Sequence, residues 1–247
     1  MVRVGDTVRR PTGRWTPSVH ALLDHLEAKG FAASPRARGL DEQGREILTF
    51  LPGETVGDVR PWPGWCWSNE TLLGVAALLR GYHDAVRDFP PRSGWRLADR
   101  PPQPGEIICH NDVAPYNLVR GHDGRLALID WDVAGPAPPE DDVAFAACAF
   151  VPMHPDDECR RLGVPEGIDR PGRLRLLADR YGLASRADFV DRMRARLAAS
   201  IDRITGAADS GDRAFQQLVA NGLLEPVRAQ REWIQANRAA LDDALSR

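Results

Sequence analysis

The chain has 247 residues, of which 43% are hydrophobic and 27% charged, and its formal net charge is −3. This length supports a buried core without disulfides, and the mildly acidic balance argues against a nucleic-acid-binding surface. No apolar run is long enough to cross a bilayer, and the N-terminus lacks the apolar stretch of a secretory signal. We therefore expect a cytoplasmic monomer or homodimer with no nucleic-acid or membrane partner.

The N-terminal region is typical of a small β-rich lobe. Its pattern predicts a hairpin over residues 2–10, a helix from Thr16 as N-cap to Gly30, and strands over residues 35–40 and 46–51. The helix carries one apolar stripe, formed by Val19, Leu22, Leu23 and Leu26. Pro52-Gly53 then breaks the pattern. We expect an N-terminal lobe over residues 1–53.

Residues 54–247 are predicted to form a larger, mostly helical lobe. Ser68 can cap a helix that runs to about Phe89. Short strands are predicted at residues 107–109, 118–120 and 126–129, the last two joined by a turn at His122-Asp123-Gly124. Further helices are predicted at about 143–150, 171–181, 186–205, 210–222 and 226–245. Strands first and helices later indicate an α+β fold.

Two segments carry the candidate chemistry. The first is HNDVAPYN, residues 110–117, and the second is LIDWD, residues 128–132. Phosphoryl transfer needs a carboxylate that deprotonates or orients the acceptor hydroxyl, and oxygen ligands that hold Mg²⁺ against the phosphates. Asp112 is the candidate base, and Asn117 and Asp130 are the candidate metal ligands, because a short hairpin returns Asp130 towards Asn117. His110 is the second residue assigned to the catalytic site, where it is expected to brace the loop by hydrogen bonds to backbone.

The motifs CHNDVAPYNLV and ALIDWDVAGP closely resemble those of the aminoglycoside phosphotransferase and choline-kinase-like superfamily. The resemblance implies a protein-kinase-like two-lobe fold and a kinase that moves the γ-phosphoryl group of ATP or GTP to a small-molecule hydroxyl, with Mg²⁺. The acceptor is expected to be an aminoglycoside-like molecule, an amino-alcohol or another metabolite. The resemblance also places the backbone of Thr49, Phe50 and Leu51 against the nucleotide base, and it makes Asp142 the acidic residue that opens a helix. Asp132 either approaches a metal or is structural.

The N-terminal lobe departs from the resemblance in two ways. The kinase pattern has a phosphate-binding Lys on the third strand, but Lys29 is the one lysine of the chain. Arg9 is the expected replacement and Arg10 the second choice, because strand alternation points one of them into the cleft. The partner Glu is not evident, although Val19 and His20 fall near its place on the helix. No G-x-G-x-x-G precedes the hairpin, so the first strand and the glycine-rich loop are expected to be missing.

Three other interpretations stay open at this point. Asp112 and Asn117 can be turn residues, with Asp130 as a cap. The chain can also be a catalytically impaired, pseudokinase-like binding protein, or a metal-dependent hydrolase that uses His110, Asp112 and Asp130 as ligands. The acidic runs at residues 140–142 and 156–158 either attract a cationic acceptor or are solvated surface.

Overall fold

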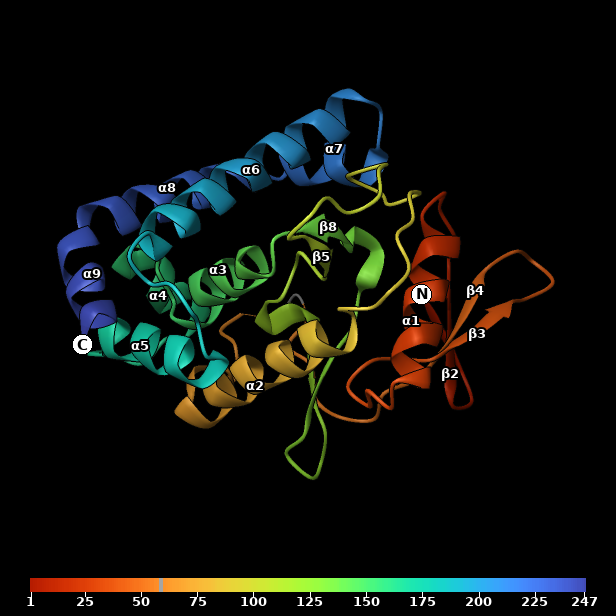
Figure 1. The fold of residues 1–247 in the computed structure, drawn as a ribbon, viewed down its shortest axis with the longest axis horizontal. Helices are drawn as coiled ribbons and strands as arrows, with labels where there is room; N and C mark the ends of the chain where they lie inside the picture. Colours follow the sequence, from red (N-terminus) through yellow and green to blue (C-terminus); the bar gives the residue numbers. More distant parts are fainter. Residues whose placement is uncertain (58–59) are drawn as a thin grey trace. The chain divides into compact units, whose positions relative to one another are not determined.

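A computed structural model describes residues 1–57 and 60–247, which form a small sheet and a larger helical part (Figure 1). This is the α+β arrangement predicted from the sequence. The chain divides into two compact units. The first contains residues 1–57 and 77–142, and the second holds the rest of the described residues. The candidate catalytic, metal-binding and nucleotide-binding residues named above lie in the first unit. The lobe boundary at residue 53 stays a prediction.

The N-terminal sheet has four antiparallel strands in the order β1-β2-β4-β3. The strands are β1 (Val2–Val4), β2 (Thr7–Arg10), β3 (Ala37–Leu40) and β4 (Glu46–Thr49). The first two form the predicted hairpin, and Gly5 in its turn has a φ of 61°, which glycine adopts without strain. Arg10 lies directly opposite Glu46 across the β2–β4 pair.

Helix α1 (Thr16–Ala28) packs beside this sheet (Figure 1). The predicted stripe is buried: Val19, Leu22, Leu23 and Leu26 are each 1% exposed or less. The predicted N-cap is one residue late, because Trp15 occupies the cap position and the Thr16 side chain accepts a hydrogen bond from the Gly13 N–H. Gly30, with a φ of 71°, follows the end of the helix as expected.

Two short sheets carry the candidate site. Strand β6 (Leu118–Arg120) pairs with β7 (Leu126–Leu128) in the predicted hairpin. Strand β5 (Ile107–Cys109) pairs with β8 (Gly135–Ala137), which the sequence did not indicate, because Pro136 in its centre lacks a backbone donor. A backbone bridge from Glu54 to Arg120 fastens the chain after β4 to β6.

The other α-helices lie mostly near the predicted places. They are α2 (Asn69–Ala85), α3 (Pro139–Phe150), α4 (Asp156–Leu162), α5 (Arg170–Tyr181), α6 (Phe189–Asp209), α7 (Arg213–Ala220), α8 (Leu224–Ala236) and α9 (Arg238–Ser246). Ser68 accepts a hydrogen bond from the Thr71 N–H, as a capping residue does. The sequence missed α4, began α3 four residues late, and predicted α8 and α9 as one helix, whereas the chain breaks at Asn237.

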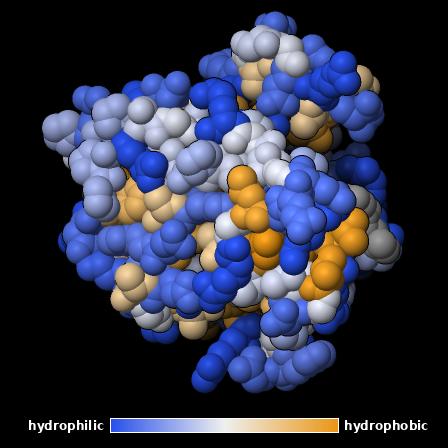
Figure 2. Space-filling view, turned by 90° about the vertical axis from the view of Figure 1, so that its right-hand side faces the viewer, coloured by the Kyte–Doolittle hydropathy of each residue, from blue (hydrophilic) through white to orange (hydrophobic). Residues whose placement is uncertain are grey.

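Polar side chains dominate the face drawn in Figure 2, where hydrophobic residues form small areas interrupted by hydrophilic ones. Among the described residues, no helix is both long and apolar enough to span a membrane.

A substitution at Gly53 tests the close approach of residues 53–54 to β6, where Glu54 and Arg120 form a backbone β-bridge. The φ of Gly53 is 154°, and a Cβ on this residue would stand 2.5 Å from the Arg120 carbonyl oxygen. We expect Gly53→Ala to lower the free energy of unfolding by about 3 kcal/mol, because backbone strain and a clash with backbone add. Urea unfolding measures the change.

The control is Gly206→Ala in α6, where a Cβ would meet no atom within 4 Å. This variant should be as stable as the wild type or more stable by about 0.5–1 kcal/mol. Equal stability of Gly53→Ala and the wild type would contradict the tight approach of residue 53 to β6.

Candidate active site

The loop between β5 and β6 carries three of the candidate residues: His110, Asp112 and Asn117. It starts with a sharp bend at Asn111, whose φ of 67° is rare for a residue other than glycine. The Asn111 side chain donates to the carbonyl oxygens of Val133 and Gly135, both at 3.2 Å. The bend is therefore held by backbone groups of the segment that follows the β6–β7 hairpin.

A buried carboxylate fixes the start of this loop. Asp142, in the first turn of α3, is 0% exposed and accepts hydrogen bonds from the N–H groups of His110 (2.8 Å) and Asn111 (2.7 Å). His83 Nε2 lies 3.2 Å from the same carboxylate. Burial alone would raise the pKa of Asp142, but the contact with His83 and the backbone hydrogen bonds keep this pKa below its ordinary value. Asp142 of the first acidic run is thus neither solvated surface nor free to bind an acceptor.

His110 braces the loop, as predicted. Its Nε2 donates to the Ile129 carbonyl oxygen at 3.1 Å, and its Nδ1 accepts from the Asp112 N–H at 3.3 Å. The ring also stands edge-on to Trp131, with 4.5 Å between centroids. Both ring nitrogens therefore contact backbone, which disfavours the reading of His110 as a metal ligand in a hydrolase.

Both carboxylate oxygens of Asp112 are hydrogen-bonded. Asn117 Nδ2 donates to Oδ2 at 2.8 Å and to the Asp112 carbonyl oxygen at 3.0 Å. The Tyr116 hydroxyl donates to Oδ1 at 2.8 Å, a contact that the sequence analysis did not anticipate. Burial raises the pKa of Asp112, and the nearby charge of Asp130 adds to this, while the two side-chain donors oppose it.

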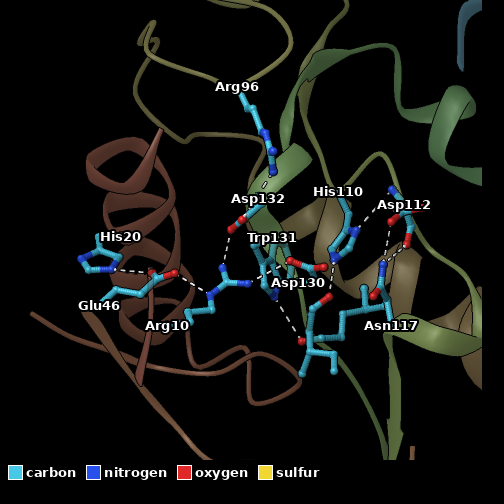
Figure 3. Close-up of polar contacts among 12 residues, drawn as sticks. Arg10, His20, Glu46, Arg96, His110, Asp112, Asn117, Asp130, Trp131 and Asp132 are labelled. Carbon is cyan, nitrogen blue, oxygen red and sulfur yellow. Dashed lines mark hydrogen bonds and ion pairs between the residues drawn. The ribbon is translucent and has the colours of Figure 1, made fainter. Parts of the chain in front are cut away.

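The β6–β7 hairpin brings Asp130 to the same place. The Ile129 N–H donates to the Asn117 carbonyl oxygen at 3.0 Å, so residues 117 and 129 face each other at the end of the hairpin and Asp130 comes next. Asp130 has a φ of 62°, which turns the chain sharply there, and its side chain is 51% exposed. The structure therefore gathers Asp112, Asn117 and Asp130 at one place (Figure 3).

Arg10, not Arg9, faces these carboxylates. Arg10 NH1 donates to Asp130 Oδ1 at 2.9 Å, NH2 donates to Asp132, and Nε donates to Glu46 (Figure 3). Arg9 points to the other face of β2, where it donates to the Thr7 hydroxyl and lies 3.8 Å from Asp41. The sequence analysis preferred Arg9 for this position, whereas the contacts of the structure favour Arg10, because the facing direction depends on the β2–β4 register.

Asp132 is paired with two arginines. Besides Arg10, Arg96 NH1 lies 3.7 Å from Asp132 Oδ2. Burial raises the pKa of Asp132, the charge of Arg10 opposes this, and Asp130 and Glu46 add to it. These ion pairs favour the structural reading of Asp132 over a direct approach to a metal.

The segment Thr49–Leu51 stands at the end of β4. The Thr49 hydroxyl accepts from the Arg36 N–H at 2.8 Å, and the Phe50 N–H donates to the Asp6 carbonyl oxygen at 2.7 Å. The Phe50 N–H is thus already used within the protein, and the guanidinium of Arg3 stacks on its ring. The contact of this segment with a nucleotide base stays a prediction.

The donor chemistry of Asn117 and Asp130 fits Mg²⁺. The Asn117 amide directs its nitrogen at Asp112, which turns its oxygen away from that carboxylate, and Asp130 offers a second hard oxygen ligand. A different group, His83, Cys109 and Asp142, also has metal-ligand atoms within 4.8 Å of one another. It is fully buried, its carboxylate already accepts two backbone hydrogen bonds, and Cys109 Sγ contacts the carbonyl oxygens of Ala137 and Pro138. We interpret this group as a hydrogen-bonded cluster that fixes the start of the loop, not as a metal site.

Comparison with known proteins identifies the family of this chain. Residues 64–177 match the model of the phosphotransferase enzyme family. The trifolitoxin immunity protein of Rhizobium leguminosarum bv. trifolii is 37% identical over 201 residues, which cover 78% of this chain and 75% of that protein. The chain therefore belongs to the phosphotransferase enzyme family.

Solved structures agree with the fold. A choline/ethanolamine kinase family protein from Mesorhizobium loti superposes with a TM-score of 0.57 at 17% identity, over 98% of this chain and 88% of that one. An aminoglycoside phosphotransferase from Alicyclobacillus acidocaldarius gives a TM-score of 0.53 at 16% identity, over 97% and 86%. The predicted kinase-like fold and the resemblance to this superfamily are confirmed.

Asp142→Asn tests the anchor of the loop. We expect it to lower the free energy of unfolding at pH 7 by about 3 kcal/mol, because it removes a buried charge and places an amide N–H against a backbone N–H. The folded-state pKa lies below the unfolded value of about 3.9, so the stabilisation is complete above about pH 5 and is lost as the pH falls through the folded-state pKa. Urea unfolding of both proteins at pH 7, 5 and 4 measures the difference.

Asp157→Asn is the matched control, since Asp157 also stands in a first helical turn but is exposed. Its effect should be about 0.5 kcal/mol or less. A stability difference between wild type and Asp142→Asn that grows towards pH 4 would contradict the lowered pKa.

Proposed function

We propose that this phosphotransferase is a small-molecule kinase that moves the γ-phosphoryl group of ATP or GTP to a hydroxyl group. The observation that carries the proposal is the convergence of Asp112, Asn117 and Asp130, with Arg10 donating to Asp130. This set offers a base, two oxygen ligands and a fixed cation, which are the parts that phosphoryl transfer requires.

Asp112 acts as the base in this proposal. The acceptor oxygen attacks the γ-phosphorus, the bond from that phosphorus to the β–γ bridging oxygen breaks, and the hydroxyl proton passes to Asp112. The hydrogen bonds from Tyr116 and Asn117 fix the rotation of the Asp112 carboxylate. Its raised pKa increases its strength as a base once it is ionised.

Asn117 and Asp130 would hold Mg²⁺ in this proposal. When bound, the ion neutralises charge on the transferred phosphoryl group. Arg10 would contact the nucleotide phosphates in place of the usual lysine, because a guanidinium binds phosphate through two parallel hydrogen bonds. Thr49, Phe50 and Leu51 remain the candidates for the nucleotide base.

The acceptor is an aminoglycoside-like molecule, an amino-alcohol or another metabolite hydroxyl. The name of the rhizobial relative adds trifolitoxin to this set. The second acidic run, residues 156–158, gives little support for binding of a cationic acceptor. Asp156 pairs with Arg170 at 2.8 Å, and Glu158 pairs with Arg161 at 2.7 Å. These acids are neutralised locally.

Asp112→Asn tests the base. Wild-type protein with Mg²⁺-ATP and a panel of aminoglycosides, amino-alcohols, sugars and trifolitoxin should release ADP only when its acceptor is present. The variant should lose about 10²–10⁴-fold of this turnover, because no general base remains, while it still binds AMP-PNP. A coupled ADP assay measures the rate.

Asp123→Asn in the β6–β7 turn is the control and should keep wild-type turnover, because its exposed side chain lies away from the three converging residues. Acceptor-stimulated turnover that survives Asp112→Asn would refute the role of Asp112. Wild-type binding of AMP-PNP with no turnover on any acceptor would favour the pseudokinase-like binding protein.

Asp130→Asn and Asn117→Ala test the ion site. Each should weaken Mn²⁺ binding in the presence of AMP-PNP about tenfold or more, because Asp130→Asn replaces a charged carboxylate ligand by a neutral amide and Asn117→Ala removes an oxygen ligand. Electron paramagnetic resonance of free Mn²⁺ gives the affinity. Wild-type affinity in both variants would place the ion elsewhere.

A further inference from the structure

Glu46 is a buried acid to which neither its strand nor the family resemblance gave a role. It is 2% exposed, and both of its carboxylate oxygens have partners. Oε1 accepts from Arg10 Nε at 2.5 Å, and Oε2 lies 3.0 Å from Nε2 of His20 on α1. Burying a carboxylate costs free energy unless it is paired and hydrogen-bonded in this way.

Glu46 restrains one edge of the Arg10 guanidinium. A free arginine side chain samples many rotamers, but a partner at Nε fixes the plane of its fork. The opposite edge, NH1 and NH2, then faces Asp130 and Asp132. Because Glu46 lies directly across the strand pair from Arg10, the sheet itself supplies this restraint.

The helix that would carry a partner acid in a kinase does not supply it here. Glu27 of α1 instead forms an ion pair with Arg38, whose guanidinium donates to both carboxylate oxygens at 2.9 and 3.1 Å. α1 instead contributes His20, which reaches the second oxygen of Glu46. The partner of the phosphate-binding cation thus comes from β4, and the helix holds that partner.

We propose that Glu46, held by His20, is the positioning residue that aims the NH1–NH2 edge of Arg10 at the nucleotide phosphates. This inference rests on the proposed function, since it assumes that Arg10 contacts nucleotide. Glu46 keeps the Nε edge when nucleotide binds, and phosphate oxygens take the outer edge. Loss of Glu46 leaves Arg10 charged but without its restraint at Nε.

A double-mutant cycle on the full chain tests this positioning role. The probe is Mg²⁺-AMP-PNP, and its affinity is measured by titration calorimetry for the wild type, Glu46→Gln, Arg10→Met and the double variant. Glu46→Gln should weaken binding about tenfold, the size expected for loss of one charge-assisted hydrogen bond. In the Arg10→Met background, Glu46→Gln should weaken the binding of Mg²⁺-AMP-PNP by less than about twofold more, because Glu46 acts through Arg10.

Two further variants sharpen the reading. Glu46→Asp keeps the charge on a shorter side chain and should recover part of the affinity. Glu27→Gln, which removes an exposed acid paired with Arg38, should bind as the wild type does. If Glu46→Gln does not fold, His20→Ala replaces it in the cycle, because His20 holds the other oxygen of the same carboxylate.

The outcomes separate the two proposals. Additive losses from Arg10→Met and Glu46→Gln, or an unchanged affinity in Glu46→Gln, would overturn the positioning role. A coupled cycle in a protein that phosphorylates no acceptor supports the positioning role and contradicts the kinase. Absence of AMP-PNP binding in the wild type would overturn both.

Discussion

One guanidinium allows three acids to stand close together. Glu46, Asp130 and Asp132 all contact Arg10, and the charges of Glu46 and Asp130 each raise the pKa of Asp132. Burial raises the pKa of Asp132, and the charge of Arg10 opposes this rise. The three carboxylates also raise the pKa of Arg10 above its ordinary value, although burial opposes this, so the cation stays charged. The same ion pairs join β2 and β4 to the turn after β7.

A second buried acid organises the other half of the site. Asp142 receives the backbone of His110 and Asn111, and His110 in turn donates to Ile129, the residue before Asp130. The candidate base and the candidate metal ligand are therefore held by one chain of hydrogen bonds that begins at the first turn of α3. Such preorganisation lowers the cost of aligning charged groups during reaction. It also explains why these polar groups tolerate burial, since each has a partner.

Much of the fold was predictable because it depends on local patterns. The Gly5-Asp6 turn, the apolar stripe of α1 and the hairpin that returns Asp130 to Asn117 are all encoded within short segments. Strand β8 was not predicted, because a proline at its centre argues against a strand. Its partner β5 is also distant in the sequence, so no local pattern indicates the pairing. The short helix α4 gave too few residues for a periodic signal.

The site was predictable where residues lie near one another in sequence, and not where a partner comes from elsewhere. Asp112, Asn117 and Asp130 form a motif with fixed spacing, and the structure brings them together. The choice between Arg9 and Arg10 depends on the β2–β4 register, which the sequence alone does not give. The pairing of Arg10 with Glu46 depends on the same register. From the alternation within β4 alone, Glu46 would be interpreted as an ordinary charged strand residue. The catalytic, metal and nucleotide roles of all these residues remain predictions.

The central claim is that this set of residues transfers phosphoryl groups to a hydroxyl. Phosphorus NMR of ATP, Mg²⁺ and the wild-type protein with each acceptor tests it most directly, because the signal of the transferred phosphorus identifies its new bond. The account predicts that one acceptor yields a phosphomonoester resonance that grows in step with ADP. Unchanged ATP with every acceptor, or inorganic phosphate as the sole new signal besides ADP, would contradict it.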